Sequence, residues 1–250
     1  MTIFVFKNAK LYLIINYNTF FNSLLIITMS IAKNLLEIKS QLPNQVTLVA
    51  VSKTKPVADL MEAYNAGQRI FGENKIQEMT EKWEQMPKDI QWHMIGHVQT
   101  NKVKFMAEYV SLIHGVDSLK LLQEINKQAL KNHRVIDCLL QIYIADEETK
   151  FGLDESELVE LLSSAEFKAL QNIRIVGLMG MATFTDNQSQ IKKEFQYLKE
   201  IFDNTNKLET SNMKLGTLSM GMSGDYKLAI ECGSTMVRIG SSIFGNRNYN

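Results

Sequence analysis

Short runs of apolar, often β-branched residues alternate with longer segments of helical periodicity along most of this chain. Eight of these runs predict β-strands. They cover residues 47–52, 69–71, 91–95, 109–114, 137–144, 174–179, 214–219 and 236–239. Strands that alternate with helices form either a closed (β/α)₈ barrel or an open doubly wound sheet, and both fit this order. Eight repeats over about 220 residues favour the barrel, folded as a single domain.

The segments between the strands place their apolar residues at helical spacing. In segment 155–168, Asp154 is placed to cap the helix, and Glu157, three residues later, completes a capping box. The apolar positions of this helix are Leu158, Leu161, Leu162 and Ala165. The same spacing predicts two further helices, with apolar positions Val57, Leu60, Met61 and Tyr64 in one and Ile191, Phe195, Leu198 and Phe202 in the other. Gly67 is predicted to end the first of these two.

The first 28 residues break this pattern. Lys7 and Lys10 precede the run "LYLIINYNTFFNSLLIIT", which has the apolar character of a signal sequence or membrane anchor. Asparagines interrupt the run, however, and no small-residue cleavage site follows it. The residues after Met29, "SIAKNLLEIKSQLP", are typical of an ordinary first helix. We therefore interpret residues 1–28 as an N-terminal extension or a misassigned start, and residues 29–250 as the barrel.

The charge balance limits the classes of partner. The chain has 27 basic and 27 acidic residues, so its formal net charge is zero. No overall field would attract nucleic acid or an anionic membrane, and any anion site must be local. Cys138 and Cys232 show no metal-type spacing, so we expect reduced core thiols in a cytoplasmic protein and no metal site.

Polar residues gather where the predicted strands end, which is the end of a barrel that carries function. After the last strand, Gly240 permits a close approach of the backbone to a ligand, and Ser241 begins a short turn or helix, "SSIFG". Free N–H groups and hydroxyls at such a start suit a phosphate. Ser219 and Ser223, in the neighbouring loop, could add donors. The loops after strands seven and eight are the usual phosphate site of this architecture.

Lys53 follows the apolar run 46–51, separated from it by Ser52 alone, and therefore lies where a buried strand would end. Partial desolvation there favours the neutral amine, which can attack an aldehyde to form a Schiff base. A reactive amine and a phosphate site on one barrel rim suggest pyridoxal 5′-phosphate (PLP), an aldehyde that carries a phosphate. Arg238 points into the barrel by alternation with Val237 and Ile239, and it needs a partner such as a pyridine nitrogen or a carboxylate.

Six stretches at the strand ends together resemble the pyridoxal phosphate homeostasis protein family. They read "LVAVSKTKP", "FGENKIQE", "WHMIGHVQTNK", "GLMGMAT", "LSMGMSGD" and "GSTMVRIGSSIFG", and the likeness runs from about Met29 to the C-terminus. The resemblance implies a single-domain TIM barrel of the alanine racemase N-terminal type, a fold-type III PLP-binding protein. It implies Lys53 as the Schiff-base lysine, Asn74 in contact with the cofactor ring or its hydroxyl, and Arg238 facing the ring nitrogen. The residues implied to hold the phosphate are Ser219, Gly240 and Ser241.

The resemblance also implies a cytoplasmic protein that maintains intracellular PLP and supplies PLP-dependent apo-enzymes, as a monomer or weak dimer. Racemases of this fold need two bases, and the second, a tyrosine, comes from a separate β-domain. The sequence ends at "FGNRNYN" after the last strand, so we expect a binding protein without turnover.

Two alternatives stay open. One is a PLP-dependent amino-acid racemase that uses His97, His114 or Tyr226 as its second base. The other is a Schiff-base aldolase on the same barrel, which would lack the yellow chromophore of bound PLP.

Overall fold

The eight predicted strands close into one parallel barrel. The computed structural model describes residues 31–147, 151–208 and 210–246. Neighbouring strands pair in sequence order, and β8 pairs with β1 to complete the circle. The strands are β1 (Thr47–Val51), β2 (Ile70–Glu73), β3 (Gln91–Met94), β4 (Val110–Val116), β5 (Ile136–Gln141), β6 (Ile173–Met179), β7 (Met213–Met222) and β8 (Met236–Ile239). The barrel prediction is confirmed, and the open sheet is wrong.

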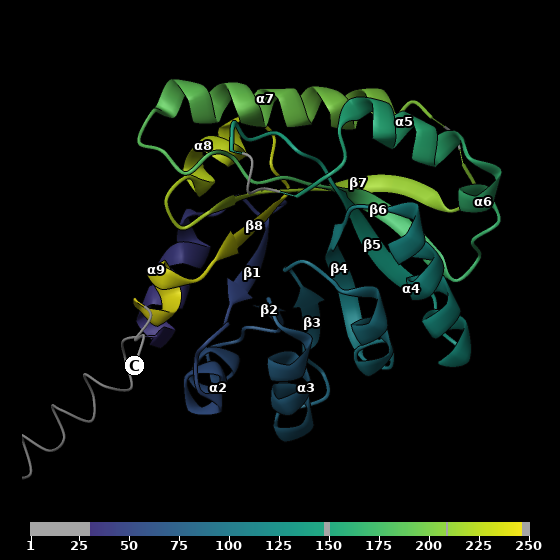
Figure 1. The fold of residues 1–250 in the computed structure, drawn as a ribbon. Helices are drawn as coiled ribbons and strands as arrows, with labels where there is room; N and C mark the ends of the chain where they lie inside the picture. Colours follow the sequence, from purple (N-terminus) through teal and green to yellow (C-terminus); the bar gives the residue numbers. More distant parts are fainter. Residues whose placement is uncertain (1–30, 148–150, 209, 247–250) are drawn as a thin grey trace, which may run out of the picture.

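Helices cover the outside of the barrel (Figure 1). Before β1, the described residues 31–41 are helical. The others are α2 (Val57–Asn65), α3 (Ile76–Gln85), the 3₁₀ helix η1 (Thr100–Phe105), α4 (Leu119–Lys131), α5 (Glu155–Ser163), α6 (Ala165–Lys168), α7 (Gln188–Thr205), α8 (Tyr226–Glu231) and α9 (Ser241–Phe244). Helix α2 ends as predicted, because Gly67 adopts a φ of 88° just beyond its cap.

The helix predicted over 155–168 is two helices. The capping box of Asp154 and Glu157 is confirmed at the start of α5. Ser164 then interrupts the segment with extended backbone, and its hydroxyl accepts a hydrogen bond from the Phe167 amide to begin α6. Ala165 is consequently exposed rather than buried. A serine side chain that caps a new turn competes with continuation of the old one.

The barrel interior has an apolar layer. Val49, Leu112, Leu139, Met179 and Met236 form a cluster separate from the larger core between barrel and helices. Alternation along each strand produces these two cores, because one face of every strand points into the barrel and the other toward the helices.

Residues 1–28, interpreted above as an extension, lie outside the described residues. Among the helices that the structure describes, none combines the length and apolar character needed to cross a bilayer. Cys138 and Cys232 are both buried free thiols.

Candidate functional site

A cavity of about 620 Å³ opens at the carboxyl ends of the strands. Five of the six predicted site residues line it: Lys53, Asn74, Arg238, Gly240 and Ser241. They come from elements far apart in sequence but adjacent in the barrel, since β1 pairs with both β2 and β8. The tertiary structure thus brings the predicted amine, the amide, the guanidinium and the serine end of α9 to one cavity.

Arg238 lies at the inner end of this cavity and is only 4% exposed. Its Nη1 donates to the backbone oxygen of Ser219 at 2.9 Å and to the hydroxyl of Ser219 at 2.7 Å, and its Nη2 donates to the backbone oxygen of Gly180 at 3.1 Å. Burial lowers the pKa of Arg238 to about 10, while the charge of Asp225 acts in the opposite direction. The guanidinium therefore stays charged at neutral pH. Within the described residues these bonds use three of its five N–H donors.

Ser219 does not line the cavity, which disagrees with its predicted contact with a phosphate. The prediction ended strand seven at Ser219, but β7 continues to Met222 through a register shift. Ser219 pairs with Met236, inside the barrel, whereas Met222 pairs with Arg238. The hydroxyl of Ser219 is fully buried beneath the arginine, and Ser223 takes its place at the rim.

A line of hydrogen bonds continues from Ser219 across the barrel. Its hydroxyl lies 3.2 Å from Nδ1 of His114, whose Nε2 lies 3.1 Å from Nδ1 of His93. Because Arg238 donates to the Ser219 oxygen, the serine proton is directed to Nδ1 of His114, and Nε2 of His114 then donates to His93. Burial lowers the pKa of His93 to about 3 and that of His114 well below its usual value, so both rings are neutral beside the buried cation.

The three candidate second bases are placed differently. His114 is fully buried, and Tyr226 turns its hydroxyl to Gln41 at 3.0 Å, so neither lines the cavity. His97 does line it, with Nδ1 3.3 Å from a carboxylate oxygen of Asp117.

The serine end of the cavity is formed by α9 and the loop after β7. Gly240 donates its backbone N–H to the hydroxyl of Ser223 at 3.3 Å, and both residues line the cavity together with Ser241. A Cβ on Gly240 would lie 3.0 Å from the backbone oxygen of Val51, so glycine allows β8 to approach the end of β1. Asp225 also lines this end, and its carboxylate accepts a hydrogen bond from the Met222 amide.

Asn74 provides a test of whether the cavity fits a polar ligand. Its Oδ1 is buried and has no hydrogen-bond partner among the described residues. An unsatisfied buried acceptor costs about 1–3 kcal/mol, so a donor from a bound ligand would stabilise it. Together with the donors of Arg238 and the hydroxyls of Ser223 and Ser241, this acceptor suits a polar ring that carries a hydroxyl and an anionic group. The residues present fit PLP.

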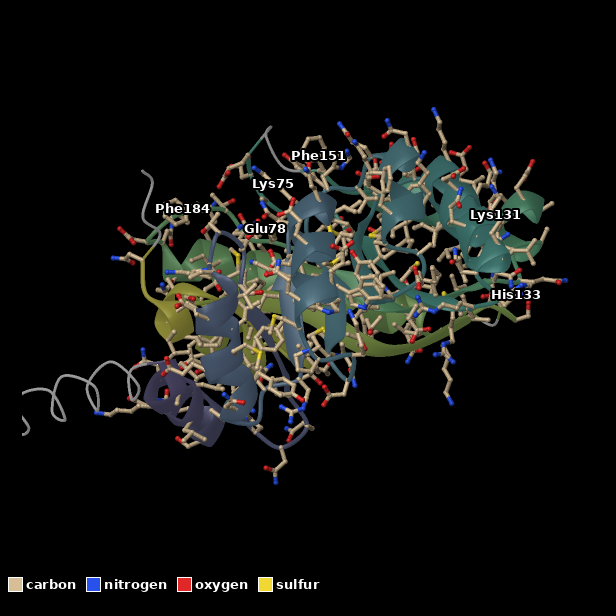
Figure 2. All side chains as sticks on the ribbon, turned by 90° about the horizontal axis from the view of Figure 1, so that it is seen from below. Lys75, Glu78, Lys131, His133, Phe151 and Phe184 are labelled. Atoms are coloured by element: carbon tan, nitrogen blue, oxygen red, sulfur yellow. The ribbon has the colours of Figure 1, made fainter. Side chains whose placement is uncertain are left out.

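Two aromatic residues at the mouth were not expected from the sequence. Phe151 is 57% exposed and stacks on His97, and Phe184 is 94% exposed. Both line the cavity, and Figure 2 shows them on the side of the molecule away from Lys131 and His133. Loop aromatics carry no periodic signal, which is why the pattern of strands and helices did not reveal them. Within the described ranges, no cluster of three metal-ligating side chains occurs.

Comparison with known proteins gives a consistent set of relatives. The family model described as alanine racemase, N-terminal domain, matches residues 26–248. The pyridoxal phosphate homeostasis protein of Haemophilus influenzae is 41% identical over 209 residues, which cover 82% of this chain and 87% of that protein. The structure of PipY from Synechococcus elongatus PCC7942 with PLP bound superposes with a TM-score of 0.79 at 35% identity, covering 86% of this chain and 100% of PipY. An alanine racemase of Clostridium difficile 630 superposes with a TM-score of 0.69 at 15% identity. The match covers 87% of this chain and 59% of the racemase, and it shows a shared fold alone.

Proposed function

This chain belongs to the pyridoxal phosphate homeostasis protein family, and from that membership and the geometry of the cavity we propose that it binds PLP through a Schiff base on Lys53. We further propose that it holds the cofactor for PLP homeostasis inside the cell and does not turn over a substrate.

One observation carries this proposal: Lys53, just beyond the end of β1, and Arg238, on β8, line the same cavity, and β1 and β8 pair. Val49 of β1 pairs with Arg238 and β1 ends at Val51, so the lysine lies four residues farther along the chain than the level of the arginine. The amine of Lys53 on the rim side and the buried cation of Arg238 on the interior side therefore lie at two levels of one cavity. The same cavity is lined by Asn74, whose Oδ1 has no hydrogen-bond partner among the described residues. That order matches an aldehyde, a ring nitrogen and a ring hydroxyl on one flat molecule.

Each residue would have a distinct part in binding. Lys53 would hold the aldehyde carbon through its amine nitrogen, with release of one water and without an oxidant or reductant. Arg238 would present a fixed cation to the ring nitrogen and disfavour its protonation. PLP supplies an electron sink when its ring nitrogen is protonated, and the arginine would weaken that property. Gly240 and Ser241, with Ser223 in place of Ser219, would hold the phosphate.

The candidate second bases bear on the choice between a binding protein and an enzyme. A racemase draws on the electron sink that Arg238 weakens, which slows the loss of a Cα proton but does not prevent it. A racemase also needs a second base, and of the three candidates only His97 lines the cavity. We therefore propose that the partners of this protein are PLP and PLP-dependent apo-enzymes in the cytoplasm.

Absorption spectroscopy of the purified protein tests the proposal. A visible Schiff-base band is expected, and borohydride reduction followed by peptide mapping should place the pyridoxyl group on Lys53. Lys53→Ala is the matched control and should lose the band. A colourless wild-type protein that still reacts with aldehydes would favour the aldolase instead. Exchange of the Cα proton of amino acids by the holoprotein, abolished in Lys53→Ala, would refute the absence of turnover.

A further inference from the structure

Charged side chains hold the backbone on the strand side of Lys53. The hydroxyl of Ser52 donates to Oε1 of Glu73 at 2.6 Å, and Nζ of Lys82 donates to the backbone oxygen of Ser52 at 2.8 Å. Lys82 also pairs with the same carboxylate oxygen of Glu73 at 2.8 Å. Ser52 and Glu73 are fully buried and Lys82 is 5% exposed, so these bonds are shielded from water.

The backbone on the C-terminal side of Lys53, at Thr54, is held by the same group of charged side chains. The backbone N–H of Thr54 donates to Oε1 of Glu78 at 2.6 Å, and Nζ of Lys82 donates to that oxygen at 2.7 Å. Thr54 has a φ of 65°, in the left-handed region that a β-branched residue rarely adopts. Such a conformation persists only where its surroundings enforce it, and the bond to Glu78 contributes together with the backbone bond from the Lys55 amide to the Ser52 oxygen at 3.1 Å.

This arrangement is costly if it serves stability alone. Two carboxylates and one ammonium are gathered around the loop 52–54, and burial raises the pKa of Glu73 against the opposing charge of Lys82 and the hydroxyl of Ser52. Buried ion pairs are weak stabilisers, because desolvation offsets most of their attraction. Strained backbone and buried charge together are typical of a loop whose geometry matters to function.

We propose that Glu73, Glu78 and Lys82 form a clamp that fixes the backbone on both sides of Lys53 and thereby aims its side chain into the cavity. The three are positioning residues: they contact the neighbours of the lysine, and none of them lines the cavity. This inference rests on the proposed function, since it assigns the geometry of the same amine. The clamp affects formation of the covalent bond and leaves the phosphate contacts of α9 unchanged.

Glu78 provides the most selective test. Its side chain is 23% exposed, so its replacement should leave the fold intact, unlike removal of a partner from the buried Glu73–Lys82 pair. Glu78→Ala removes the acceptor for the Thr54 amide, whereas Glu78→Gln keeps an acceptor oxygen at the same position. Glu81→Ala, an exposed glutamate of the same helix, is the matched control. Figure 2 shows Glu78 on the side of the molecule where Phe151 and Phe184 mark the cavity mouth.

The experiment separates the covalent step from binding. Apo-protein is mixed with PLP, and the growth of the Schiff-base band is followed by stopped-flow absorbance. Binding of pyridoxine 5′-phosphate, which has an alcohol in place of the aldehyde, is measured by calorimetry. Glu78→Ala should form the bond about tenfold more slowly, as expected for loss of a hydrogen bond to a charged group, and should bind the analogue within about twofold of the wild type. Glu78→Gln and Glu81→Ala should behave as the wild type does.

An unchanged rate in Glu78→Ala would overturn the clamp. So would an equal loss of analogue affinity and rate, since that result describes a residue that merely supports the fold. A wild-type protein that forms no band would refute the proposed function instead. The clamp would then be judged on the apo-protein, where Glu78→Ala should speed hydrogen exchange of the Thr54 amide by at least about tenfold.

Discussion

Ser219 is buried beneath Arg238 and does not line the cavity. Ser219→Ala should therefore lower the stability of the fold and leave the affinity for a phosphate group unchanged. The substitution removes a hydroxyl that accepts from Arg238 at 2.7 Å and lies 3.2 Å from His114. A buried hydrogen bond to a charged group contributes about 1.5–3 kcal/mol. Arg238 keeps its bonds to two backbone oxygens, from Ser219 and Gly180, so we expect the free energy of unfolding to fall by about 2 kcal/mol. For a chain of this size the melting temperature should then fall by roughly 4–8 °C.

Urea denaturation followed by tryptophan fluorescence measures this loss, and Ser223→Ala is the comparison. Among the described residues, the hydroxyl of Ser223 accepts a single bond, from the Gly240 amide at 3.3 Å, and it lies at the partly exposed rim. The stability of that variant should therefore lie within about 0.5 kcal/mol of the wild type. Affinity for pyridoxine 5′-phosphate should show the opposite order, with Ser223→Ala the weaker binder. If Ser219→Ala keeps full stability but loses phosphate affinity, our placement of the two serines is wrong.

Three further predictions follow from the same site. Lys53→Ala should lose the visible band yet retain weak binding of PLP through the phosphate contacts; an unchanged spectrum would mean that another residue bonds the aldehyde. Arg238→Glu replaces the cation beside the ring nitrogen with a carboxylate, so the absorption band of bound cofactor should shift. The carboxylate also faces the backbone oxygens of Gly180 and Ser219, so the free energy of unfolding, measured by denaturation, should fall by about 3 kcal/mol or more. Because the folded-state pKa values of His93 and His114 lie below the unfolded value near 6.5, the unfolded chain binds more protons in acid. The contribution of these two rings to the free energy of unfolding is therefore complete above about pH 6.5 and is lost as the pH falls toward about 3. The slope should reach up to about 2.7 kcal/mol per pH unit in denaturation experiments at several pH values. A flat profile would contradict neutral buried rings.

Much of the site could be predicted because its residues stand at ends of strongly patterned strands. Lys53 follows an apolar run without interruption, and Arg238 lies between two apolar residues of a strand. Strand alternation gives each a direction, and the parallel barrel sends all the carboxyl ends to one rim. Local chemistry also identified the capping box at Asp154 and the turn at Gly67.

The errors lie where local pattern is weak. The stretch "SMGMSGD" alternates small and apolar residues, and it does not reveal that β7 continues to Met222 through a register shift, with Gly221 at a φ of 95°. The pattern therefore predicts Ser219 at the rim, whereas this residue is buried and does not line the cavity. Lys82 had no signal either, because a lysine in "EKWEQ" has the pattern of a solvated helix face, yet only 5% of it is exposed.

Periodicity and residue type are local properties of the sequence. They are enough to predict the barrel, the rim that carries the site, and the amine, guanidinium and serines expected there. Packing alone sets which serine lines the cavity, which histidines lie behind the arginine, and which charges contact the loop around Lys53. Those outcomes depend on register between strands and on which helix packs over which loop, and pairings across the chain leave no trace in the spacing of residues along it.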